Sequence, residues 1–319
     1  MSVEEPSSHA ELHVHGLMLC ATILVATSFP VAAAITGSLD SAVLTFIRFA
    51  LATLLFAPFV AYAHQLTLPD KWDLLRYSTL SLLLVTFFWC MFVSLRLTSP
   101  LNTAAIFSIN PVITSVFAVI ILREKMPHAA RIALPIGMFG AVWVVFRGDI
   151  DAMISLDVGV GDLIFLAGTC ALAGYSTLVK VLHRGEPMAN MTFWVLFTGT
   201  IWLSVLVAPK LGGVEWSQIP VSVIFGVAYL SVFTTIVTFF LFQWSTTKIG
   251  PSRVAAYTFL NPGLVLLTSI ALGGPLPQSA AWPGIFLTIA ALVVLQSAKR
   301  GNAAQALARP ATHHVFRKG

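Results

Sequence analysis

The segment NTAAIFSINPVITSVFAVIIL, residues 102–122, is an apolar run with an Asn110-Pro111 pair near its middle. A second segment, VAAYTFLNPGLVLLTSIALGG at 254–274, carries the same pair as Asn261-Pro262. A proline inside a helix removes one hydrogen bond of the ladder and costs about 3 kcal/mol. Because the same costly break occurs in two long apolar helices, we expect it to serve the fold or the function.

The composition indicates that these helices lie in a bilayer. The chain is 57% hydrophobic and only 10% charged, with a mean hydropathy of +0.88, whereas soluble domains carry about 25% charged residues. A spanning helix needs about 20 apolar residues, so we predict an all-α integral membrane protein with ten transmembrane helices. They are expected at about 16–36, 41–63, 74–96, 100–122, 129–147, 159–181, 190–209, 220–244, 251–273 and 281–298, the last two divided by a Gly273-Gly274-Pro275 break.

The loop charges predict the orientation. The N-terminus is acidic and the first basic residue is Arg48, so the start of the chain does not resemble a signal peptide. If the N-terminus is inside, the inner loops and the C-terminal tail hold fourteen Lys and Arg residues and the outer loops hold three. Positive charge marks the cytoplasmic side. We therefore expect both termini in the cytoplasm and a multi-pass protein of the cell (inner) membrane.

The chain contains an internal repeat. A shift of 151 residues places Asn110-Pro111 on Asn261-Pro262, and the matching apolar, serine and proline positions include Phe88 on Phe239, Ser94 on Ser245 and Pro100 on Pro251. We expect one five-helix repeat at 16–147 and a second at 159–298, with cytoplasmic tails at 1–15 and 299–319. Five is an odd number, so the second repeat enters the membrane from the opposite side. Inverted repeats are a common plan of transporters, with the substrate site at the repeat interface.

Three segments carry a family resemblance: RFALATLL at 48–55, SLRLTSPLNTAAIFSINPVITSVFAVIILREK at 94–125 and GPSRVAAYTFLNPGLVLLTSIALGG at 250–274. Over residues 16–298 the chain resembles the EamA-type, ten-helix branch of the drug/metabolite transporter superfamily. The fourth and ninth helices of that family typically end in an acidic residue, which Glu124 matches, whereas Pro275 stands at the second position. The resemblance implies export of small metabolites by alternating access through a central cavity. Amino-acid exporters of the YddG kind are the nearest match.

The Asn-Pro pairs supply the first candidate site residues. Pro111 and Pro262 are expected to kink their helices and to release the carbonyls of Phe107 and Thr258, four residues earlier. Such groups need a partner or a wet cavity in lipid. Asn110 and Asn261 add amide groups at the same places. These faces predict either the wall of a substrate cavity or a hydrogen-bonded contact between kinked helices, and we favour the cavity.

Three further residues are candidates for substrate binding. Arg48 is the only charge well inside a predicted helix, and an intramembrane charge is a functional hypothesis by default. It would attract a substrate carboxylate, or it would pair with helix carbonyls. Trp89 and Tyr175 lie in the middle of their helices, where their amphipathic rings suit a cavity wall or the packed core.

The sequence lacks the motifs that are typical of other classes of function. We find no nucleophile–base pair, P-loop or dinucleotide fingerprint, so we predict that the protein is not an enzyme and has no cofactor. The three cysteines are isolated and the eight histidines fall in predicted tails or loops, so no metal site is expected. No basic patch is interleaved with exposed aromatic residues, which argues against nucleic acid. The expected partners are a small-molecule substrate and the lipid bilayer, with a monomer or homodimer as the assembly.

The favoured function is export of small metabolites, most of all neutral or aromatic amino acids and related amphipathic compounds. One alternative is transport of nucleotide sugars or other anionic metabolites. Such substrates would prefer several Lys or Arg residues in the cavity, whereas Arg48 is the only such candidate in the sequence. The other alternative is a membrane protein that does not transport, for which the paired Asn-Pro faces would be unnecessary.

Overall fold

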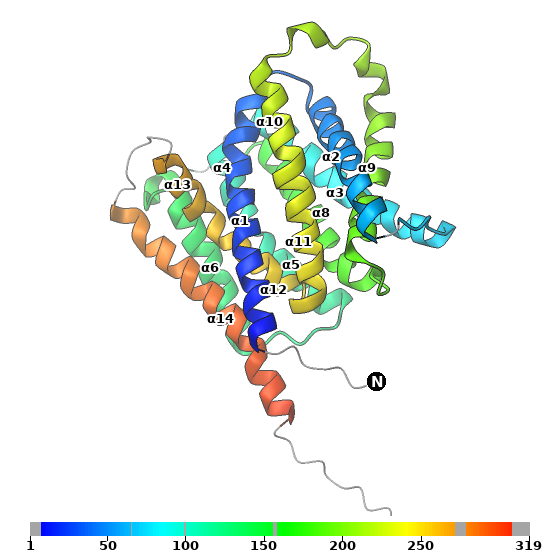
Figure 1. Cartoon of the computed structure of the whole chain (residues 1–319). Helices are drawn as coiled ribbons and strands as arrows, with labels where there is room; N and C mark the ends of the chain where they lie inside the picture. The colour runs from blue at the N-terminus through cyan, green and yellow to red at the C-terminus, as the bar shows by residue number, and fades with distance from the viewer. Residues whose placement is uncertain (1–7, 65, 99, 156–157, 272–278, 308–319) are drawn as a thin grey trace, which may run out of the picture.

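The computed structural model describes residues 8–64, 66–98, 100–155, 158–271 and 279–307, and the element labels follow Figure 1. Every regular element in these ranges is a helix, so the all-α prediction is confirmed. The first half contains α1 (Ser8–Thr36), α2 (Ser41–His64), α3 (Lys71–Leu97), α4 (Pro100–Phe107), α5 (Asn110–Ile121), α6 (His128–Val145) and the short α7 (Ile150–Ile154).

The second half follows a similar order, with an additional interruption in the helix that corresponds to α3. It contains α8 (Val160–Leu182), α9 (Met188–Leu211), η1 (Trp216–Gln218), α10 (Val221–Ser231), η2 (Val232–Val237), α11 (Thr238–Ile249), α12 (Pro251–Ala256), η3 (Tyr257–Leu260), α13 (Asn261–Ala271), η4 (Ser279–Ala281) and α14 (Trp282–Leu307). Helical elements therefore occur in each of the ten predicted segments. The predicted Gly273-Gly274-Pro275 break lies outside the described residues.

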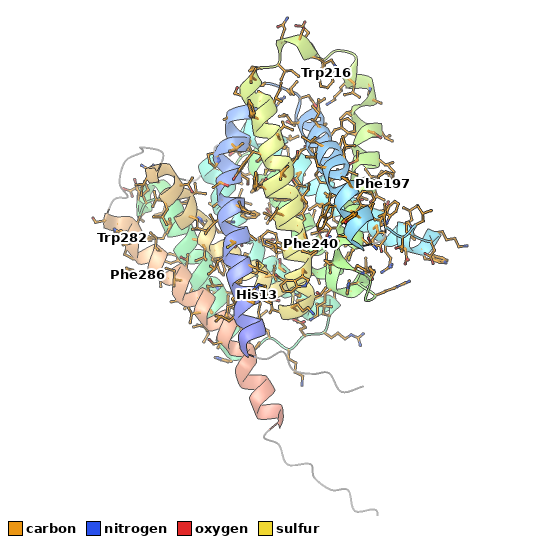
Figure 2. The ribbon with its side chains drawn as sticks, in the orientation of Figure 1. His13, Phe197, Trp216, Phe240, Trp282 and Phe286 are labelled. Carbon is orange, nitrogen blue, oxygen red and sulfur yellow. The ribbon has the colours of Figure 1, made fainter. Side chains whose placement is uncertain are left out.

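Eight helices in the described ranges are long and apolar enough to cross a membrane, and the stretch Ala105–Ile121 is shorter. The segment predicted at 251–273 is divided among α12, η3 and α13, so its crossing stays a prediction. Large apolar side chains point away from the bundle, as Trp282 and Phe286 do on α14 (Figure 2), and Phe286 is 66% exposed. Such an apolar outer surface suits lipid rather than water.

The two ends of the helical bundle can be told apart in Figure 1. The start of α1 and the end of α14 both lie at the end that is lower in the view. The helices α1 and α14 extend beyond the predicted bounds of 16–36 and 281–298, because their helical ladders continue past the apolar residues on which those bounds rested. The cytoplasmic tails expected at 1–15 and 299–319 stay a prediction. The cytoplasmic location of this lower end stays a prediction.

Both helices with an Asn-Pro pair are interrupted just before it. The helix α4 ends at Phe107 and α5 begins at Asn110, while α12 passes into the 3₁₀ turn η3 and α13 begins at Asn261. Each proline therefore lies in the first turn of a new helix, where the backbone N–H has no intrahelical partner to lose. The structure thus avoids most of the cost of a proline in a helix interior.

One interruption was not predicted. The segment expected as one regular helix at 220–244 contains the π-helical turn η2, in which the hydroxyl of Thr235 donates to the carbonyl of Leu230 at 2.8 Å. A π turn inserts one residue into the helix and occurs often at functional sites. The apolar pattern could not reveal it, because apolar residues continue through the turn from α10 into α11 without a helix-breaking residue.

Candidate functional site

A central cavity of about 90 Å³ lies where both halves of the chain meet. Typical ligand pockets measure about 300–1,000 Å³, so the cavity must widen before it can hold a metabolite. Its lining comes from α1, α2, α3, both Asn-Pro helices, α8 and the η2–α11 region. The residues are Val25, Ser28, Arg48, Phe87, Phe88, Met91, Phe107, Asn110, Leu172, Tyr175, Ser176, Thr234, Thr238, Phe239, Phe242, Val254, Ala255 and Thr258.

Five of the seven predicted substrate-binding residues line this cavity. They are Arg48, Phe107, Asn110, Tyr175 and Thr258. These residues come from five separate elements and from both halves of the sequence. The structure therefore brings them together around one space, although nothing bound there identifies a ligand.

Arg48 is held at the cavity by the π turn. Its Nε donates to the hydroxyl of Thr235 at 2.7 Å, and its Nη2 donates to the carbonyl and the hydroxyl of Thr234 at 2.8 and 3.0 Å. The guanidinium carbon lies 4.3 Å from the centre of the Phe88 ring, a cation–π contact. No ion pair joins Arg48 to a carboxylate of the described residues. Arg48 is only 2% exposed, so its positive charge is buried beside neutral acceptors.

Tyr175 is positioned by a buried chain of polar groups from α9 through α11 to α8. Thr192 bonds to Oε1 of Gln243, and Nε2 of Gln243 donates to the Tyr175 hydroxyl at 2.8 Å. An amide nitrogen can only donate. The oxygen of Tyr175 is therefore the acceptor, and its own hydrogen remains available to an acceptor in the cavity.

The phenylalanine lining contains the repeat-related pair Phe88 and Phe239. Their ring centres are 5.6 Å apart, although the residues are 151 positions apart in the sequence. Equivalent residues of two repeats come into contact only where the repeats meet. The central cavity is therefore next to the interface between the two repeats. The alignment of Phe88 with Phe239 was the sequence signal for this wall, but neither residue was among the predicted site residues.

Two predicted site residues lie elsewhere. Trp89 is 40% exposed and shares an outward-facing stripe of α3 with Leu75 and Leu82, each two helical turns apart, so the prediction that its ring faces the cavity is wrong. Asn261 is 3% exposed and is not among the lining residues, and neither atom of its amide has a hydrogen-bond partner among the described residues.

The Asn110 amide has a different environment. Its Oδ1 lies 3.5 Å from the Thr114 hydroxyl, at the limit of a hydrogen bond, and Asn110 faces the cavity from the start of α5. Thr258, from η3, donates its hydroxyl hydrogen to the carbonyl of Ala255 at 2.8 Å, which leaves its lone pairs toward the cavity. The two Asn-Pro helices thus contribute different polar groups to the cavity.

A second cavity, of about 200 Å³, lies at the lower end between α5, α6, α12 and α14, and its lining includes Glu124, Lys125 and Arg253. Arg253 bonds through Nε to Oε1 of Gln296 at 2.8 Å, and its Nη2 lies 3.3 Å from Nε2 of His15. The Nδ1 atom of His15 lies 2.5 Å from the Tyr257 hydroxyl. The sequence placed His15 in a tail, so this contact between α1, α12, η3 and α14 was missed. We regard the central cavity as the candidate site, because it contains the buried unpaired charge and residues of both Asn-Pro helices.

Comparison with known proteins agrees with this architecture. The model of the EamA-like transporter family matches the chain twice, over residues 14–146 and 159–296. The chain belongs to the EamA-like transporter family. The two matches confirm the two-repeat organisation and the predicted family, and they agree with a multi-pass membrane transporter. The YddG-type specificity stays a prediction.

Two curated relatives come from Bacillus subtilis (strain 168). The protein described as uncharacterized transporter YyaM is 28% identical over 205 residues, which are 64% of this chain and 65% of YyaM, so the match spans slightly less than two thirds of that relative. Uncharacterized transporter YdfC is 23% identical over 249 residues, 75% of each chain. A crystal structure with no further description matches 92% of this EamA-like chain with a TM-score of 0.68 and 17% identity, a likeness of fold alone.

Proposed function

We propose that this EamA-like transporter exports small metabolites that carry one carboxylate and an apolar or aromatic body, with neutral and aromatic amino acids as its first substrates. The observation that carries the proposal is Arg48, a buried cation without a carboxylate partner among the described residues, in a cavity walled by phenylalanine rings. An ionisable residue inside the membrane is a functional-site hypothesis by default.

Each part of such a substrate has a partner in the lining. The carboxylate takes the place of Thr234 and Thr235 as acceptor for the Arg48 guanidinium, which donates in a planar fork that suits carboxylate. The apolar side chain packs among Phe88, Phe107 and Phe239. The oxygen of Asn110 is an acceptor for the ammonium group of an amino acid.

The transport cycle follows from the small size of the central cavity. With about 90 Å³ available, substrate entry requires the surrounding helices to separate, and the same applies to release on the other side. The interruptions before Asn110 and Asn261 and the turn η2 lie in three helices around the cavity. Interrupted helices bend at the break, so we propose alternating access in which the half-helices on either side of these breaks move.

The proposal is tested by counterflow in proteoliposomes that contain the purified full-length protein. A panel of radiolabelled amino acids, sugars and cationic drugs is offered, with protein-free liposomes as the control. We expect exchange of phenylalanine and leucine that exceeds the control and saturates. Exchange of sugars or cationic drugs without any amino acid would overturn the substrate class, and no exchange of any compound would favour a protein that does not transport.

Transport of nucleotide sugars or other multiply charged anions is the second candidate. Such substrates need several cations for their phosphate groups, and Arg48 is the one charged residue among the described lining residues. The geometry therefore favours a substrate with a single negative group. The proposed location is the inner membrane, with both termini in the cytoplasm.

A further inference from the structure

We propose that the central cavity also transports, and prefers, aromatic monocarboxylates that lack an amino group. This inference rests on the proposed function and narrows its substrate class. It comes from the balance of charge in the cavity rather than from its shape. A compound such as 3-phenylpropanoate, which is phenylalanine without the ammonium group, is the simplest example.

Arg48 makes the cavity electropositive. An arginine side chain does not lose its proton in proteins, so Arg48 carries a full positive charge while only 2% exposed. A buried charge without a counter-ion is unfavourable in low dielectric. A monocarboxylate makes the loaded cavity neutral, a zwitterion leaves one net positive charge, and an amine without a carboxylate produces two. We therefore expect the cavity to bind a monocarboxylate best, a zwitterion less well and an amine without a carboxylate least.

Two hydrogen-bond donors besides Arg48 belong to the cavity lining. The Tyr175 hydroxyl accepts from Gln243 and so has its hydrogen available, and the hydroxyl of Thr238 has no hydrogen-bond partner among the described residues although it lines the cavity. Both groups can donate to carboxylate oxygens, as Arg48 does. Charged acceptors strengthen such bonds about twofold, so these donors favour an anion.

The acceptors of the cavity are neutral. The hydroxyls of Ser28, Ser176 and Thr258 donate their hydrogens to backbone carbonyls of nearby residues, which leaves only lone pairs toward the cavity. These lone pairs can accept from an ammonium group. They cannot neutralise its charge, and no Asp or Glu belongs to the described lining. An ammonium group is therefore tolerated rather than selected.

The test uses three compounds with one skeleton: phenylalanine, 3-phenylpropanoate and phenethylamine. Each competes with radiolabelled phenylalanine in counterflow, and efflux of radiolabelled 3-phenylpropanoate is measured directly at pH 7.5 against protein-free liposomes. We expect 3-phenylpropanoate to compete at a lower concentration than phenylalanine. Phenethylamine should need a concentration at least roughly tenfold higher, since it lacks the group that bonds to Arg48.

Substitutions of Arg48 test whether this residue causes the preference. In Arg48→Gln the difference between 3-phenylpropanoate and phenethylamine should shrink to about twofold or less, whereas Arg48→Lys keeps the charge and should keep the order. Phe225→Leu, at a site of α10 that is 72% exposed, is the matched control and should behave as wild type. If Arg48→Gln does not fold, the competing concentrations of the three compounds in the wild type and in Arg48→Lys still test the preference.

Each result has a distinct meaning. If phenylalanine exchanges but 3-phenylpropanoate competes no better than phenylalanine does, the preference is wrong and the amino-acid proposal stands. If 3-phenylpropanoate is transported and phenylalanine is not, the preference stands and the amino-acid proposal is wrong. If neither is transported above the protein-free control, both are wrong. The inference is also overturned if the three compounds keep the same order of competing concentrations, with unchanged differences, in Arg48→Gln.

Discussion

Asn110 and Asn261 occupy equivalent positions in the two repeats but have different surroundings. Asn110 lines the central cavity, whereas Asn261 is buried outside the lining with both amide atoms unpartnered in the described part of the chain. A buried amide without partners is costly, and the α-helical ladder is interrupted just before both residues. The repeat therefore preserves the helix interruption, while the chemistry at the cavity differs between its two copies.

This difference gives a matched pair of variants. Asn110→Leu keeps the volume and removes the hydrogen bonds, so substrate affinity should fall by roughly ten- to a hundredfold if a charged group of the substrate is bound there. Asn261→Leu should leave affinity unchanged and raise the unfolding temperature, because it removes an unsatisfied polar group. Half-saturating substrate concentrations and thermal unfolding in detergent measure both effects. Equal losses of affinity in the two variants would contradict the placement of Asn261.

A second residue-scale prediction concerns Gln243, which positions Tyr175 from outside the cavity. Gln243→Leu should weaken substrate binding because the Tyr175 hydroxyl loses its fixed orientation, and Tyr175→Phe should weaken it by a similar factor. The double variant should be no worse than either single variant, since both remove the same interaction. A double-mutant cycle of half-saturating concentrations measures this. Additive losses would show that the two residues act independently.

The sequence identified the polar members of the site better than the apolar ones. Arg48, Asn110 and Tyr175 were predicted because polar groups are rare in apolar helices. Trp89 was assigned wrongly because the rotation of α3 cannot be read from a helix that is apolar on all sides. For the same reason Phe88, its neighbour in sequence, was not recognised as a lining residue.

At the scale of elements, the interruptions are the features that connect fold and function. The Asn-Pro pairs were visible in the sequence, and the structure begins a new helix at each asparagine. The turn η2 was not visible, since its formation depends on hydroxyl bonds to the Leu230 carbonyl and on Arg48, which comes from a distant part of the chain. Local patterns therefore predict helices better than they predict the breaks that tertiary contacts stabilise.

The break before Asn110 can be tested with Pro111→Ala. Alanine supplies the N–H that proline lacks, so a continuous helical ladder through α4 and α5 becomes accessible. We expect the maximal transport rate to fall several-fold while substrate affinity stays within about twofold, because the break serves movement rather than binding. Pro135→Ala is the control, since Pro135 lies inside the regular helix α6 and outside the central lining. An unchanged maximal rate in Pro111→Ala would show that the break is not a hinge.

At the scale of the whole molecule, the two-repeat plan was predictable because a duplication leaves matching positions at one offset. The ends of α1 and α14 were not, since helices extend beyond their apolar stretch where the flanking residues continue the ladder. Contacts such as that of His15 with Tyr257 and Arg253 join residues more than 230 positions apart. Such contacts depend on the packed fold, and a single sequence does not indicate them.

The orientation is tested by single cysteines in a variant whose three native cysteines are replaced by alanine. Cysteines at Ser155 and Gly213 should react with an impermeant thiol reagent applied outside the cell, whereas cysteines at Ala129 and Pro187 should react only after permeabilisation. All four positions are exposed in the structure, so access to the reagent depends on the membrane alone. The reversed pattern would invert the predicted topology.

The central claim is that substrate occupies the cavity between the repeats, and protection of one cysteine from alkylation measures this directly. Ser176→Cys, in the same background without native cysteines, places a thiol in the central lining, and Gly213→Cys places one in a distant loop. Saturating phenylalanine should slow alkylation of the cysteine at Ser176 several-fold and leave the cysteine at Gly213 unaffected. If phenylalanine is transported yet both cysteines react at the same rates with and without it, the substrate does not bind in this cavity and the account is wrong.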